Sequence, residues 1–75
     1  MKSIAITLED LRDGRIRATG RENGRTVIYK DGLPSEAKSL LSDVMATTCR
    51  FHRIDSGYDM EFIQLNEAAK SAIQS

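Results

Sequence analysis

Five arginines fall within residues 12–25, and a guanidinium group can hold a carboxylate or a phosphate through two parallel hydrogen bonds. The whole chain has 11 basic and 11 acidic residues, whereas this segment has a local charge of about +3 by side-chain charge. It can therefore contact phosphates or a carboxylate-rich protein surface. The alternative is a solvated face whose arginines pair with Glu9, Glu22 or Glu61 across strands. The five residues are Arg12, Arg15, Arg17, Arg21 and Arg25.

The composition around these arginines favours a protein partner over a nucleic acid. Nucleic-acid-binding modules usually carry an overall basic excess and aromatic side chains that stack on bases. This chain is neutral, and Tyr29 is the only aromatic residue near the arginines. The use of arginine also favours recognition, because lysine is sufficient for solubility. We therefore expect a partner-binding surface made of the five arginines and Tyr29.

A second group of reactive side chains lies in the run CRFHRID, which contains Cys49, His52 and Asp55. Their spacing would align them on one face of a helix, where a cysteine–histidine nucleophile or a metal triad can form. On a strand, residues three apart point to opposite faces, so Cys49 and His52 could not meet. Because we predict a strand here, we interpret Cys49 as a core residue beside Phe51 and His52 as a surface residue.

No other pattern in the sequence predicts catalysis, a cofactor or a metal site. Asp55 and Asp59 flank a Ser-Gly-Tyr turn, but the alternating acids of a calcium loop are absent. The chain has no glycine-rich phosphate loop and no GxSxG or HExxH motif. One cysteine also excludes a four-cysteine zinc site within one chain. We therefore expect a protein that is not an enzyme and binds no cofactor or metal.

The single cysteine and the N-terminal residues predict a cytoplasmic protein. A lone thiol forms no intramolecular disulfide and suits a reducing compartment. The opening MKSIAITLEDLRDG lacks the apolar core of a signal peptide, and no apolar run approaches the roughly 20 residues of a membrane span.

The chain of 75 residues is near the lower size limit for one stable core. A homodimer, which buries more surface, would be consistent with this size.

Alternating apolar residues predict a three-stranded antiparallel meander over residues 3–30. The Asp-Gly and Asn-Gly pairs at 13–14 and 23–24 are turn signals between its strands. Arg15 and Arg17 are predicted to project from the face opposite the apolar one, with the other arginines near the turns. The predicted apolar face consists of Ile4, Ile6, Leu8, Ile16 and Ala18.

Residues 34–46 predict an amphipathic helix, because apolar residues recur at i, i+3, i+4, i+7 and i+8. Pro34 suits the first turn, Ser35 is the predicted N-cap, and Glu36 favours the positive end of the helix dipole. The β-branched pair Thr47–Thr48 is predicted to end the helix. The apolar stripe consists of Ala37, Leu40, Leu41, Val44 and Met45.

The remaining segments complete the order βββ-α-ββ-α. Residues 48–65 are predicted to form a hairpin around an Asp-Ser-Gly turn; alternatively, the helix runs on to about Arg53 and one strand follows. Residues 66–75 are a short helix, with Asn66 as N-cap, or a frayed tail. We predict a single α+β domain over 1–75: a two-layer sandwich with the main helix packed on one face of an antiparallel sheet.

The strand pair IAITLEDLRDGRIRATG, followed by one amphipathic helix and no catalytic motif, resembles the short accessory proteins encoded by bacteriophages and prophages. The resemblance covers about the first 45 residues, concerns their general sequence pattern and includes no diagnostic motif. It implies a compact protein that works by binding, as inhibitors of host machinery do, anti-CRISPR proteins among them. No functional residue is carried over from it.

The sequence therefore predicts a non-enzymatic domain that binds another protein, or a second copy of itself, through the arginine-rich face of the meander. The resemblance makes an inhibitor of a host factor one form of this function. The alternative is a small nucleic-acid-binding protein that uses the same arginines, as a dimer that doubles the basic surface.

Overall fold

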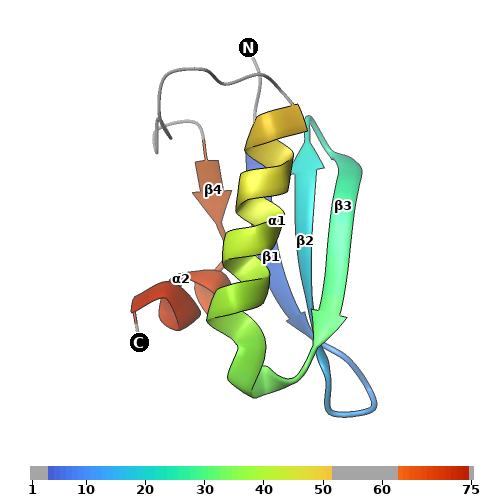
Figure 1. Ribbon diagram of the computed structural model, residues 1–75, viewed down its shortest axis with the longest axis vertical. Coiled ribbons are helices and arrows are strands. Elements are labelled where there is room, and N and C mark those ends of the chain that lie inside the picture. The colour runs from blue at the N-terminus through green and yellow to red at the C-terminus, as the bar shows by residue number, and fades with distance from the viewer. Residues whose placement is uncertain (1–3, 52–62, 75) are drawn as a thin grey trace.

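The computed structural model describes residues 4–51 and 63–74, which form one sheet with its helices on one side (Figure 1). The strands of the meander follow from their own residue patterns, whereas the end of the main helix and the pairing of the last strand require the structure. In chain order the elements are β1 (Ile4–Asp10), β2 (Ile16–Glu22), β3 (Arg25–Gly32), the 3-10 turn η1 (Pro34–Glu36), α1 (Ala37–Phe51), β4 (Ile63–Leu65) and α2 (Glu67–Gln74).

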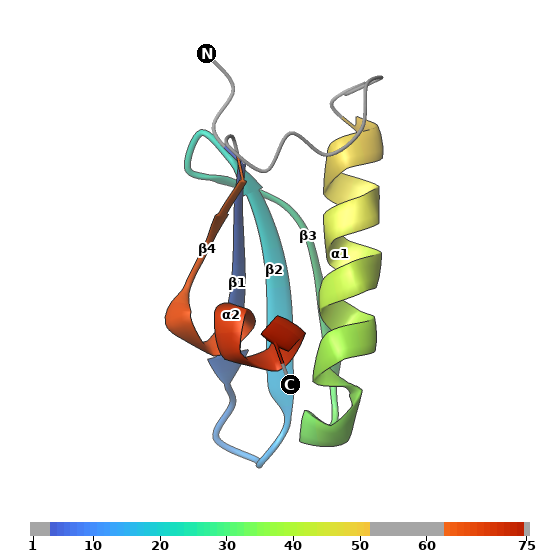
Figure 2. The same ribbon diagram turned by 90° about the vertical axis from the view of Figure 1, so that its left-hand side faces the viewer.

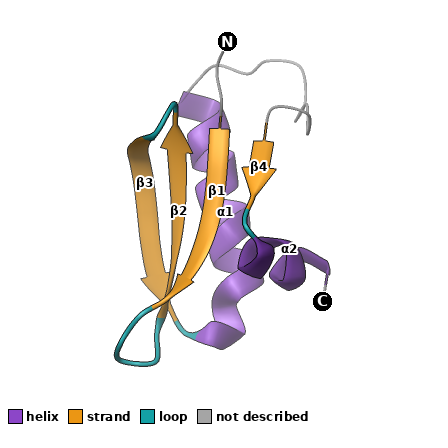
Figure 3. Ribbon diagram, turned by 180° about the vertical axis from the view of Figure 1, so that it is seen from behind, coloured by secondary structure: helices purple, strands orange, loops and turns teal. Residues whose placement is uncertain are grey.

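The described strands form a mixed sheet with the order β3-β2-β1-β4. β1, β2 and β3 are antiparallel neighbours, which confirms the predicted meander. β4 lies on the other side of β1 and runs parallel to it, with Ile63 opposite Ile4 and Leu65 opposite Ile6 (Figure 3). Within the described residues, β3 and β4 are therefore the edges of the sheet.

Both turns of the meander form at their glycine signals. Asn23 and Gly24 link β2 to β3 with φ angles of 49° and 84°, and positive φ at both central residues is what a type I′ hairpin requires. In the β1–β2 turn the Leu11 amide donates to the Arg15 carbonyl at 2.8 Å, and Gly14 has a φ of 85°. These two turns fix which residues of the three strands face each other.

The apolar face of the meander is covered by α1, and α2 lies on the same side of the sheet (Figure 2). The predicted helix stripe is confirmed, because Leu40, Leu41 and Val44 are buried while Ala37 and Met45 pack against them. No described helix lies on the opposite face of the sheet. The other buried core residues are Ile4, Ile6, Leu8, Ile16, Ala18, Cys49, Ile63 and Ala69.

The predicted α+β sandwich is confirmed, but the predicted hairpin over 48–65 is wrong where the structure describes it. Residues 48–51 continue α1, as the alternative interpretation expected, and β4 is a single strand parallel to β1. Thr47 and Thr48 do not end the helix. Thr48 is fully buried, and its hydroxyl donates to the Val44 carbonyl at 2.7 Å inside the helix.

The start of the main helix also differs from the prediction. Pro34 is in the first turn as expected, but Ser35 lies inside η1 and Leu33 is the residue before it. The Leu33 amide donates to the Glu36 carboxylate at 3.0 Å, and the Glu36 amide donates to the Leu33 carbonyl at 2.8 Å. Because Glu36 satisfies the free amide of this turn, no serine cap is needed.

Gly20 determines how closely α1 approaches the sheet. This buried residue of β2 faces α1, and a Cβ atom placed on it would collide with the Thr48 hydroxyl and lie 3.2 Å from Cγ1 of Val44. The pairing of β2 with β3 also shifts beside it, since Gly20 is opposite Ile28 and Arg21 is opposite Thr26. One residue of β3 is thus left without an opposite partner, which is a β-bulge.

Replacement of Gly20 by alanine should lower the free energy of unfolding by about 2 kcal/mol, the usual cost of overpacking a core. Urea unfolding followed by circular dichroism measures this loss. In a double-mutant cycle, Thr48→Ala should make the alanine at position 20 less costly, because it removes the colliding hydroxyl. Strictly additive losses in the cycle would contradict the contact.

Asn66 joins α2 to the central strand. Its Oδ1 accepts from the amides of Leu8 at 3.2 Å and Ala69 at 3.0 Å, and its Nδ2 donates to the Leu8 carbonyl at 3.0 Å. The side chain therefore extends the β1–β4 pairing by one step and also caps α2. The predicted C-terminal helix and its Asn66 cap are both present.

Asn66→Ala should cost about 1–3 kcal/mol of unfolding free energy, because it leaves backbone groups of Leu8 and Ala69 without partners. Asn66→Asp is the matched control. It keeps the Oδ1 acceptor for the cap but loses the Nδ2 donor, so its stability should lie between those of the wild type and the alanine variant. Equal stability of all three proteins in thermal unfolding would show that the side chain does not join the two elements.

Candidate functional site

The face of the sheet opposite α1 carries the polar half of each strand, and we refer to it as the open face. Register pairs place Glu9 opposite Arg17, Thr7 opposite Thr19, and Ala5 opposite Arg21. Alternation together with the β-bulge brings three residues of β3 to this face beside β2. The open face consists of Ala5, Thr7, Glu9, Arg17, Thr19, Arg21, Thr26, Tyr29, Asp31 and, beside Ala5 on β4, Gln64.

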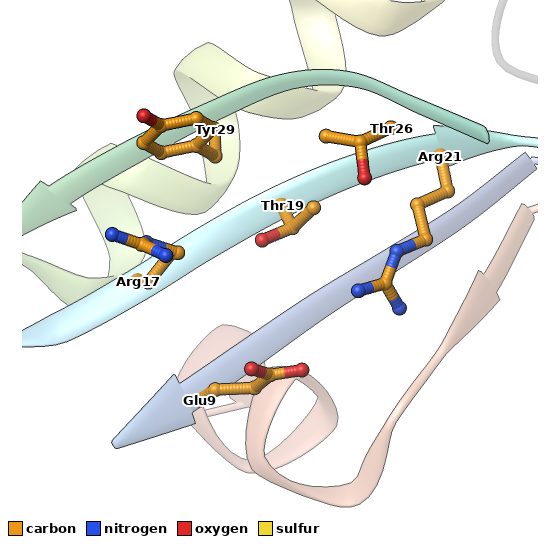
Figure 4. Close-up of a pocket in the computed structure, with 6 residues that line it drawn as sticks. All are labelled: Glu9, Arg17, Thr19, Arg21, Thr26 and Tyr29. Carbon is orange, nitrogen blue, oxygen red and sulfur yellow. The ribbon is translucent and has the colours of Figure 1, made fainter. Parts of the chain in front are cut away.

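A shallow hollow of about 240 Å³ lies on the open face. Figure 4 shows its lining side chains, which project from the three strands of the meander around the centre of β2. The predicted surface residues Arg17, Arg21 and Tyr29 meet here. The hollow is lined by Glu9, Arg17, Thr19, Arg21, Thr26 and Tyr29.

Arg17 is held rigidly on one side of the hollow. Its Nε and Nη2 atoms donate to the two carboxylate oxygens of Asp31 at 2.7 and 3.0 Å, and its guanidinium lies 4.5 Å from the ring centroid of Tyr29. The hydrogen bonds from Arg17 lower the pKa of Asp31, and those to Asp31 raise the pKa of Arg17. The charge of Arg17 is therefore compensated, while the 56% exposed Tyr29 is fixed in place.

Thr19 forms the floor of the hollow. Only 4% of this residue is exposed, and its hydroxyl points into the hollow without a hydrogen bond from any side chain that the structure describes (Figure 4). Opposite it on β1, the Oγ1 atom of Thr7 is buried and has no hydrogen-bond partner. Thr7 does not line the hollow, so of these two residues Thr19 alone offers a hydroxyl donor and acceptor to a bound group.

Arg21 and Glu9 bring opposite charges to the two ends of the hollow. Neither side chain forms an ion pair with another described residue. The register places Arg21 beside Ala5, four residues from Glu9 along β1, which is a backbone separation of about 13 Å at the usual rise per residue. Figure 4 shows the Arg21 side chain extending across the hollow toward the Glu9 carboxylate, and Glu9 also attracts Arg17, which lies opposite it. Within the described residues, the open face thus presents a cation and an anion that form no direct ion pair.

The structure separates the other predicted arginines from the open face. Arg15 was expected beside Arg17, but it lies in the turn before β2, where its Nε donates to Asp13 at 2.8 Å. Hydrogen bonds from Arg15 lower the pKa of Asp13. Arg12 is exposed in the same turn, whereas Arg25 is exposed at the start of β3, at the other end of the sheet.

The expected arginine partners also differ. In the described residues, Arg15 forms its ion pair with Asp13 and Arg17 forms its ion pair with Asp31, and neither pairs with Glu9. Glu61 lies outside the described residues. Three residues that line the hollow, Glu9, Thr19 and Thr26, were not part of the surface predicted from the sequence. Strand alternation was a sufficient signal for the first two, because both alternate with predicted core residues.

The cysteine of the run CRFHRID is a core residue, as predicted, although it lies on a helix. Cys49 is 5% exposed in α1, and burial raises the pKa of its thiol. His52, Asp55 and Asp59 lie outside the described residues. Within residues 4–51 and 63–74, no group of three or more histidine, cysteine, aspartate or glutamate side chains could hold a metal ion.

No helix in the described part of the chain combines the length and the apolar character that crossing a membrane requires. Comparisons of the sequence with protein-family models and with curated proteins, and of the structure with solved structures, give no match.

The ion pair predicts how Asp31 titrates. Because the folded pKa is lowered, the pair contributes stability above about pH 3.9, the value of a free aspartate, and this contribution is lost as pH falls through the folded pKa. Carboxyl ¹³C NMR should give an Asp31 midpoint below 3.9, with Tyr29 ring shifts at the same midpoint. Arg17→Gln should return the Asp31 midpoint to about 3.9. An unshifted midpoint in the wild type would rule out a persistent pair.

Proposed function

We propose that this protein is a non-enzymatic interaction domain that binds another protein through the open face. The resemblance to short phage and prophage accessory proteins makes a host factor the expected partner, in a cytoplasmic setting. The observation that carries the proposal is the fixed Arg17–Tyr29 stack beside the unpaired Arg21, on a sheet face without a described helix.

The stack supports binding because it is already ordered in the free protein. Tyrosine and arginine are enriched among the residues that dominate protein interfaces. Fixing such long side chains during binding normally costs conformational entropy, and the bidentate bond from Arg17 to Asp31 removes much of that cost beforehand. Tyr29, stacked against this ordered arginine, therefore offers an exposed aromatic surface to a partner.

The charge on the open face favours a protein partner over a nucleic acid. Glu9 and Asp31 balance Arg17 and Arg21, so the face has no net charge. Binding along a phosphate backbone draws its affinity from an excess of cations. Arg12 and Arg25 lie at the two ends of the sheet, whereas Arg15, whose charge also lowers the pKa of Asp31, is already paired with Asp13.

The proposal assigns no chemistry to the cysteine. A reactive cysteine needs a lowered pKa and access to substrate, whereas Cys49 is buried and its pKa is raised.

The hollow on the open face has the side chains of Glu9, Arg17 and Arg21 around the hydroxyl of Thr19. Such a set of charged groups and a hydroxyl can bind polar groups of a partner.

The proposal predicts that Arg21→Glu and Tyr29→Ala each reduce capture of the partner at least about tenfold, as expected for dominant interface residues. Tagged protein would be incubated with a lysate of the organism that encodes it, and bound proteins would be quantified by mass spectrometry. Arg12→Glu and Arg25→Glu are the matched controls. They make the same charge change outside the open face and should leave capture unchanged.

Two results would overturn this proposal. The first is equal capture by the wild type and Arg21→Glu, which removes the open face from the interaction. The second is a captured complex that nuclease destroys and whose affinity falls steeply with salt, because this behaviour belongs to phosphate contacts. The nucleic-acid alternative would then replace the protein-binding one.

A further inference from the structure

We propose that the open face is self-complementary and that two copies of the protein bind face to face through it, each Glu9 pairing with Arg21 of the other copy. This inference deepens the proposed function and rests on it, because the same face would then be shared between a second copy and another partner. It gives the dimer a control function, since dimerisation would cover the partner-binding residues.

The two ends of the open face carry opposite charge. A face that binds its own copy must present equal numbers of opposite charges, placed so that a two-fold axis brings oppositely charged regions together. The open face has two cations and two anions. Glu9, Arg17 and Asp31 lie at one end and leave it with one net negative charge, whereas Arg21 gives the other end one positive charge.

The strand register places the two charged ends at equal distances from the centre of the face. Thr7 and Thr19 lie opposite each other, midway between the Ala5–Arg21 pair and the Glu9–Arg17 pair. Consider a two-fold axis that passes above Thr7 and Thr19, parallel to the sheet and perpendicular to its strands. It exchanges the two ends of the face, so it places Glu9 of each copy above Ala5 of the other, beside Arg21. It also places Arg21 of each copy above Arg17 of the other, whose charge Asp31 compensates.

Side-chain size agrees with this arrangement. The short side chain of Ala5 leaves space next to Arg21 for an incoming carboxylate. Two sheets packed in this way would form an aligned sandwich, the common arrangement for sheets that meet face to face.

The area of the face predicts a weak dimer. Three strands of this length have a flat area of about 350 Å² by strand spacing and rise, so two copies bury about 1,000 Å² once side-chain relief is included. Specific interfaces usually bury at least about 1,200 Å². We therefore expect a dissociation constant on the order of 100 µM, with the protein monomeric when dilute and dimeric when concentrated.

The test uses purified full-length protein and sedimentation equilibrium at concentrations up to about 1 mM, well above the expected constant. Glu9→Arg and Arg21→Glu should each weaken self-association at least about tenfold, because each places like charges opposite each other twice in the dimer. An equimolar mixture of the two variants should associate at least as well as the wild type. In the mixed dimer both pairs again join opposite charges, which also shows that both variants are folded.

Glu67→Arg and Arg12→Glu are the matched controls, because both residues are exposed and lie outside the open face. Each should self-associate like the wild type, and their mixture should show no gain. A wild type that stays monomeric at about 1 mM overturns the inference, as does a mixture of Glu9→Arg and Arg21→Glu that fails to associate. Loss of capture in Arg21→Glu with a monomeric wild type would overturn the dimer alone and leave the proposed function in place.

Discussion

The close approach of α1 to β2 at Gly20 is the contact on which the arrangement of this protein depends. Any larger residue there would push the helix away from the sheet, because Thr48 and Val44 already occupy the space. With the helix seated on this face, the apolar half of each strand is covered and the polar half is left on the other side. The open face is thus a direct consequence of how the core is packed. The buried apolar residues that the structure describes form one cluster, as expected for a chain of this size.

The polar residues of the open face divide into a fixed part and a free part. Arg17, Asp31 and Tyr29 hold each other in place and contribute shape more than charge. Arg21 and Glu9 keep their charges unpaired and can steer and orient a partner. This division resembles the general construction of protein interfaces, in which a rigid aromatic or arginine anchor is surrounded by polar contacts that fix the register.

The sequence was sufficient to predict the meander, the helix stripe, the Asn66 cap and the face on which Arg17 lies, because each depends on local periodicity or turn chemistry. It was insufficient for the end of α1. Thr48 is a weak helix former by propensity, and its full burial against the sheet at Gly20 is a tertiary contact that outweighs this preference. The position of β4 was also inaccessible, since strand pairing over such a distance is a tertiary property. The site was predicted in part, because the bulge in β3 brings Thr26 and Tyr29, three residues apart, to one face.

The most direct test of the account is NMR spectroscopy of isotope-labelled protein, dilute enough to be monomeric, in buffer and in a lysate of the organism that encodes it. Amide and methyl signals of each residue report where the protein is contacted. The account predicts shifts and broadening at Thr7, Thr19, Arg21 and Tyr29, with the exposed residues of α1 unchanged. Changes centred on α1 or on the turn around Arg12, with the open face unaffected, would contradict the claim that this face is the interaction surface.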